Sequence, residues 1–169
     1  LGKAKAMAQG IACVNNLKQL QICWLMYCGD FNDVLPPTTP VFDSLTDRNS
    51  MSATPDSWVF GNAWTDTDST NIQRSVLFCY NKSLGIYRCP ADKSTVRDQG
   101  KIPRTRSYSI SWYMGMWPDP GEGYHRYTWH RLDQIRNPGP AQALVFVDDV
   151  AALYVRRGTS LLPVQTGGA

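Results

Sequence analysis

Acidic residues that could bind a divalent cation gather at two places in the chain. Asp66 and Asp68 alternate along a polar segment, so that in an extended backbone their carboxylates point the same way, and Asn71 adds a neutral oxygen. Calcium takes about six to eight oxygen ligands and tolerates irregular geometry. The glycine and the distal glutamate of a helix–loop–helix calcium site are missing here. The segment therefore predicts either a calcium site or the cap of a following helix.

The second acidic pair, Asp148 and Asp149, ends the strand-like segment LVFV. Adjacent carboxylates repel each other unless a cation or an arginine offsets their charge. Either pair alone supplies only two side chains, so a full calcium shell needs backbone carbonyls, water, or the two pairs meeting in space. We predict a calcium ion bound by carboxylates of at least one of the two pairs. Asp30, Asn32 and Asp33 form a third polar set, which we expect to end a helix.

The histidines do not form an obvious catalytic or metal site. His125 and His130 are five residues apart, so they point to different sides of either a strand or a helix. No nucleophile elbow, zinc-binding helix or phosphate-binding loop occurs in the sequence. If the chain is a hydrolase, a calcium ion would polarise an ester carbonyl, while His125 or an aspartate activates water. The sequence itself names no catalytic residue.

The chain has five cysteines, and none of them forms a C-x-x-C pair that would indicate a zinc ribbon. Cys13 and Cys28 lie on or beside the apolar side of a predicted helix, which favours a role as small core residues. Cys79 and Cys89 flank a predicted turn and could form a disulfide if the protein is exported.

The composition is that of one ordinary globular domain. The chain has 169 residues, 43% of them hydrophobic and 18% charged, and a net charge of +3. It contains no apolar run long enough to cross a bilayer. The basic residues of the segment 97–106 accompany no nucleic-acid-binding module, so we expect no nucleic-acid partner.

One long helix dominates the predicted structure. Six apolar side chains recur at helical spacing over residues 4–35, and residues 1–29 are assigned to the helix. These are Ile11, Val14, Leu17, Leu20, Trp24 and Cys28. We expect Leu17, Leu20 and Trp24 to pack on a sheet, because one apolar stripe requires a covering layer. Residues 1–8 have few large apolar groups and should make no contact with the sheet.

The rest of the chain predicts short strands and one further helix. We expect a loop over residues 36–57, a helix over 72–80, and strands over 58–64, 86–90, 107–117, 124–132 and 144–149. The fold class is α+β, a long N-terminal helix packed on a small antiparallel sheet. It forms a single domain over 1–169, with the helix at 1–29, the sheet and loops at 30–149, and a tail at 150–169.

Several segments of the sequence resemble those of one protein family. The first segment is KAKAMAQGIACVNNLKQLQ, which is followed by W-x-x-Y. The later segments are TDSTNIQRSVLFCYNKSLGIYRCPADKS, PRTRSYSIS and LVFVDD. In this order they resemble pseudopilin-like proteins, relatives of type II secretion pseudopilins and type IV pilins, over residues 4–149. The basic leader and the apolar anchor of the family's precursors are absent from this sequence. The tail at 150–169 does not follow the family's pattern.

The resemblance implies a pilin-like fold and a role in assembly. It implies the soluble domain of a filament subunit whose partners are other pseudopilin-like subunits. The full-length form would be exported or associated with the cell envelope, and would meet a membrane only through an N-terminal segment missing here. Major pseudopilins hold calcium in a late loop, which favours Asp148 and Asp149 as metal ligands. The chain is also similar to pseudopilin-like proteins that act as calcium-dependent acyl-homoserine lactonases, so a hydrolase that opens a small acyl-lactone is the alternative.

Overall fold

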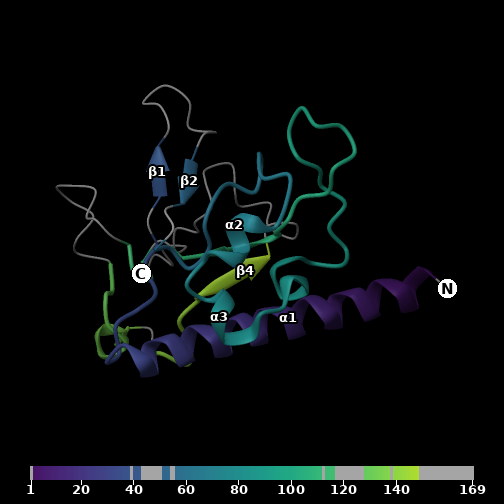
Figure 1. The fold of residues 1–169 in the computed structure, drawn as a ribbon. Helices are drawn as coiled ribbons and strands as arrows, with labels where there is room; N and C mark the ends of the chain where they lie inside the picture. Colours follow the sequence, from purple (N-terminus) through teal and green to yellow (C-terminus); the bar gives the residue numbers. More distant parts are fainter. Residues whose placement is uncertain are drawn as a thin grey trace, which may run out of the picture.

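A long N-terminal helix, α1 (Gly2–Asp30), is the main element of the fold. The computed structural model describes residues 2–38, 40–42, 51–53, 56–111, 113–116, 128–137 and 139–148. In Figure 1, α1 runs along one side of the domain, and its N-terminal end extends past the other elements. Residues 2–8 are helical and exposed, as expected for a segment without sheet contacts. The helix ends where Asn32 and Asp33 adopt positive φ angles of 52° and 65°.

The buried face of α1 differs in part from the predicted stripe. Leu20 and Trp24 are 0% and 1% exposed, as predicted, and Leu17 is partly buried against the same core. The prediction was wrong for Ile11 and Val14, which are 61% and 51% exposed. Cysteine and tyrosine side chains continue the buried face instead, at the same helical spacing. They are Cys13, Cys23 and Tyr27, and Cys28 of the predicted stripe is buried as predicted.

Short helical segments cover much of this buried face. Two helices, α2 (Thr70–Gln73) and α3 (Phe78–Asn81), replace the single helix predicted over 72–80. The hydroxyl of Ser75 donates to the Asn71 carbonyl and accepts from the Phe60 N–H, so it competes with a continuous helical ladder. The strand predicted over 86–90 is wrong, because the 3-10 helix η1 (Leu84–Tyr87) occupies its first residues. α1 contacts η1, α3 and the strand β4 (Phe146–Asp148).

Two antiparallel strand pairs form the β structure of the described residues. β3 (Tyr108–Ile110) pairs with β4 (Phe146–Asp148), with Ser109 opposite Val147. β1 (Pro40–Phe42) pairs with β2 (Met51–Ala53) inside the predicted loop over 36–57. Residues 58–64 form no strand, and Gly61 in their middle has a φ of 82°. Residues 132–134 form a short 3-10 helix, η2 (Leu132–Gln134), at the end of the predicted strand 124–132.

The α+β class predicted from the sequence is confirmed, with the core lying between α1 and the segments that cover it. Leu77 and Ile110 are fully buried there beside Trp24 and Tyr87, which are each 1% exposed. Within the described residues, no helix has the length and apolar character needed to cross a membrane. His125, Asp149 and the tail at 150–169 lie outside the described residues.

Candidate functional site

The carboxylate of Asp66 is part of an internal polar network. Asn71 Nδ2 donates to one of its oxygens at 2.9 Å, and Arg106 Nη1 lies 3.5 Å from the other. Arg106 is 4% exposed and also donates to the carbonyls of Phe60 and Gly61 at 2.7 and 2.6 Å. A Cβ at Gly61 would overlap Asp66 and Asn71, so the close approach requires glycine. A cation at Asp66 would have to compete with Arg106.

Asp68 lies one position before Ser69, the N-cap residue of α2. Its Oδ1 accepts the backbone N–H of Thr70 at 2.8 Å. This bond, together with one from the Thr70 side chain, lowers the pKa of the Asp68 carboxyl. This bond forms a local turn before α2, whose N-cap residue Ser69 makes no side-chain capping hydrogen bond, so the predicted cap by Asp68, Ser69 or Thr70 is not formed as such. Calcium binding at Asp66 and Asp68 stays a prediction.

Asp30 and Asp148, two further predicted oxygen ligands, lie on different elements, α1 and β4. Asp148 ends β4 and is half-buried, whereas Asp149 lies outside the described residues. Asp30 accepts a hydrogen bond from the Tyr80 hydroxyl at 2.9 Å. Among the described residues, neither Asp66 nor Asp68 belongs to a cluster of three or more metal-ligating side chains. In the part of the chain that the structure describes, the group of metal-ligating side chains that contains Asp148 includes neither of these two aspartates.

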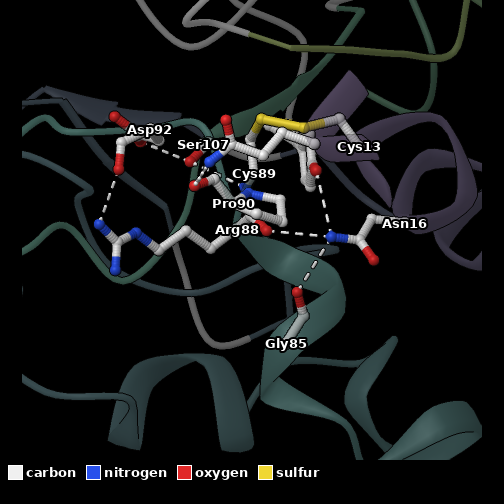
Figure 2. Close-up of a disulfide and its surroundings, with 10 residues drawn as sticks. Cys13, Asn16, Gly85, Arg88, Cys89, Pro90, Asp92 and Ser107 are labelled. Atoms are coloured by element: carbon white, nitrogen blue, oxygen red, sulfur yellow. Dashed lines mark hydrogen bonds between the residues drawn. A yellow bond between two sulfur atoms is a disulfide. The ribbon is translucent and has the colours of Figure 1, made fainter. Parts of the chain in front are cut away.

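A disulfide joins α1 to the segment after η1, as Figure 2 shows. It links Cys13 to Cys89, which are 76 positions apart in the chain. This corrects the interpretation in which Cys79 was the partner of Cys89, whereas Cys13 belongs to the core, as predicted, and is in addition disulfide-bonded. Cys79 is instead free and exposed, on α3. The two bonded cysteines are buried, with exposures of 7% and 3%.

Polar side chains of α1 reinforce the disulfide on both sides along the helix. Asn16 Nδ2 lies 3.2 Å from the Gly85 carbonyl, 3.0 Å from that of Arg88 and 3.3 Å from the Tyr108 hydroxyl (Figure 2). One turn earlier than Cys13, Gln9 Nε2 donates to the carbonyl of Pro90 at 3.1 Å. We call the disulfide with the side chains of Gln9 and Asn16 the clasp. Its three members are three or four residues apart, so they share one face of α1.

Asp92 and Ser107 form a buried hydrogen-bonded pair next to the clasp. The Ser107 hydroxyl donates to Asp92 Oδ2 and accepts the backbone N–H of Cys89 at 3.2 Å. Asp92 Oδ1 accepts the N–H of Ser94 at 2.7 Å. Burial alone would raise the pKa of Asp92, but the hydrogen bonds from Ser107 and Ser94 and the charge of Arg88 outweigh it and lower that pKa. The pair fixes the backbone on which Cys89 lies.

The carboxylate of Asp148 lies next to the disulfide. One oxygen of Asp148 and the sulfurs of Cys13 and Cys89 all lie within 4.8 Å of one another. Asp148 reaches this position because it is the register partner of Tyr108, whose hydroxyl is bonded to Asn16 of the clasp. This is the single group of three or more potential metal-ligating side chains within the described part of the chain. The sequence pattern gave no sign of it, since its members come from three distant segments.

The outward side of α1 carries a second apolar stripe. Its members recur at helical spacing on the side away from the core, with Lys18 interrupting them. They are Met7, Ile11, Val14, Ile22 and Leu25, with exposures of 70%, 61%, 51%, 56% and 46%. Soluble domains tolerate single exposed apolar residues, whereas several of them along one side of a helix indicate an interaction surface.

Comparison with known proteins finds no match among family models, curated proteins or solved structures.

Proposed function

We propose that this chain is the soluble domain of a pseudopilin-like filament subunit, in which the outward stripe of α1 packs against α1 of neighbouring copies. The stripe is the observation that carries the proposal. A 29-residue helix is about 43 Å long at about 1.5 Å per residue, and its N-terminal part extends beyond the elements that cover its other face (Figure 1). Such a helix offers apolar surface on a side that no described part of this chain covers.

The charges of α1 support another copy of α1 as the occupant of this stripe. Lys3, Lys5 and Lys18 are its charged side chains before the last residue, Asp30, and Asp33 follows in the terminal turn. A parallel neighbour shifted along the helix axis would place the basic part of one copy beside the acidic end of the next. Burying each large apolar side chain of the stripe would add about 1.5–3 kcal/mol.

The test compares two charge substitutions on the same helix. Ile11→Glu places a carboxylate within the stripe, whereas Ala6→Glu adds the same charge at an exposed position about 140° round the helix, at about 3.6 residues per turn. We expect concentration-dependent self-association of the wild-type chain in sedimentation velocity, retained in Ala6→Glu and lost in Ile11→Glu. A monomeric wild-type chain at millimolar concentration, or equal behaviour of both variants, would contradict the proposal.

Calcium-dependent opening of an acyl-homoserine lactone remains the alternative from the sequence. This reaction requires a calcium ion, whose charge polarises the lactone carbonyl, and a base that activates water. The same protein preparations, assayed for lactone opening with calcium and with chelator, separate it from a purely structural role.

A further inference from the structure

We propose that the cysteine pair of the clasp, when reduced, forms a binding site for a thiophilic divalent cation such as Zn²⁺, with Asp148 as the third ligand. The ligand set is defined by position, because the two sulfurs and one carboxylate oxygen already lie within 4.8 Å of one another. Zinc binds cysteine sulfur at about 2.3 Å and carboxylate oxygen at about 2.0–2.2 Å, so small side-chain rotations could bring all three onto one ion.

The chemical character of the three groups selects the ion. Two thiolates favour Zn²⁺ or Cd²⁺ over the hard cation Ca²⁺, which binds through oxygen. With the disulfide reduced, the two thiolates and Asp148 would bring three negative charges into a partly buried place, and a divalent cation offsets most of that charge. A fourth position would be filled by water, as in open zinc sites.

Reduction of the disulfide must precede metal binding. A phosphine reductant takes up one water, becomes the phosphine oxide, and converts the Cys13–Cys89 disulfide into two thiols. Binding of Zn²⁺ then releases the two thiol protons and forms two zinc–sulfur bonds. The two sulfurs cannot form a disulfide with each other and bind the metal at the same time. The oxidised chain therefore has no such site. In either form, α1 is cross-linked to the segment that carries Cys89.

The surroundings hold the ligands in place without the disulfide. The Asn16 and Gln9 hydrogen bonds keep α1 against residues 85–90, and Ser107 binds the N–H of Cys89. β3 and β4 hold Asp148 through their backbone pairing. These contacts do not involve the sulfur atoms, so they remain available after reduction.

The experiment titrates Cd²⁺ and Zn²⁺ into the full chain carrying Cys79→Ser, because Cys79 is the exposed free thiol. We expect one Cd²⁺ per chain after phosphine reduction, with cadmium–thiolate absorption in the ultraviolet, and no such band in the oxidised chain. Cys89→Ser in this background should abolish the band. Asp148→Asn should weaken the affinity by about tenfold or more, whereas Asp98→Asn, at an exposed turn position, should leave it unchanged.

A second readout does not depend on any substitution in the cluster. Zn²⁺ should raise the melting temperature of the reduced chain and leave that of the oxidised chain unchanged, since a cation that binds only the folded state stabilises it. Equal metal binding by oxidised and reduced chains would overturn the proposal. So would an Asp148→Asn variant that binds Cd²⁺ as tightly as its parent. These outcomes are independent of whether the chain forms filaments.

Discussion

At the scale of single residues, Asp92 is the clearest buried charge with a defined role. Its pKa is lowered in the folded state, so it contributes stability that is present above its ordinary pKa of about 3.9 and is lost as pH falls through the lowered value. Asp92→Asn should therefore reduce the free energy of unfolding at pH 7 by about 1.5–3 kcal/mol, the worth of hydrogen bonds to a charged group. Denaturant melts at pH 7 and below pH 4 measure this, and the difference between wild type and variant should shrink in acid. A constant difference across pH would contradict it.

The free thiols should differ sharply in reactivity. Burial, followed by the charge of Asp33, raises the pKa of Cys28 to about 12, and burial also raises the pKa of Cys23. Because the thiolate is the reacting form, both should resist alkylation in the native protein. Cys79 is exposed and should be the one rapidly labelled cysteine. Mass spectrometry after iodoacetamide treatment without reductant checks this, with the denatured chain as the control that labels three cysteines.

At the scale of elements, the two faces of α1 should respond differently to truncation. Trp24 is 1% exposed, so Trp24→Ala should cost about 3–5 kcal/mol of stability through lost burial and a residual cavity. Ile11 is 61% exposed, so Ile11→Ala should change the stability of the monomer by less than about 0.5 kcal/mol. Equilibrium unfolding of both variants at low protein concentration gives the comparison. An equal loss would place Ile11 in the core after all.

The sequence predicts α1 well and its buried face only in part, for a physical reason. Two sides of the helix carry apolar residues at helical spacing, one with Ile11 and Val14 and the other with Cys13 and Leu20. The pattern alone therefore cannot say which of the two stripes the rest of the chain covers. The 3-10 helix η1 was missed because IYRC has strand-like residues, while its conformation is set by packing against α1. Tertiary contacts decided both cases.

The clasp could not be derived from local patterns. Cys13 and Cys89 are separated by 76 positions, whereas Cys79 and Cys89 are near neighbours around a turn. Connectivity depends on which segments meet in the fold, and sequence spacing does not record this. Asp68 shows that a local pattern can locate a turn better than its details, because its carboxylate accepts the Thr70 N–H just before α2, while the N-cap residue Ser69 makes no side-chain cap.

At the scale of the whole molecule, the disulfide fixes α1 to the rest of the domain. Closing a loop of this length is worth about 4 kcal/mol in the chain-entropy model. Reduction in the presence of chelator should therefore lower the free energy of unfolding by about that amount. It should leave α1 helical by circular dichroism, because the core contacts of Leu20 and Trp24 do not depend on the sulfurs. A reduced chain that unfolds at the same denaturant concentration would show that the covalent link adds nothing.

Calcium is the remaining prediction at this scale, and the hydrolase alternative depends on it. Binding to the folded state alone would stabilise the oxidised chain by about 2.7 kcal/mol at a calcium concentration about a hundred times the dissociation constant. Chelator should then lower the melting temperature, and Asp148→Asn should abolish that sensitivity.

Asp66→Asn is a poorer probe, because it breaks the ion pair with Arg106 and destabilises the chain without any metal. Asp98→Asn serves as the matched control, because asparagine accepts the positive φ of 57° at that position. If chelation changes neither the melting temperature nor lactone opening, the chain has no calcium site that matters to its stability, and the hydrolase alternative falls with it.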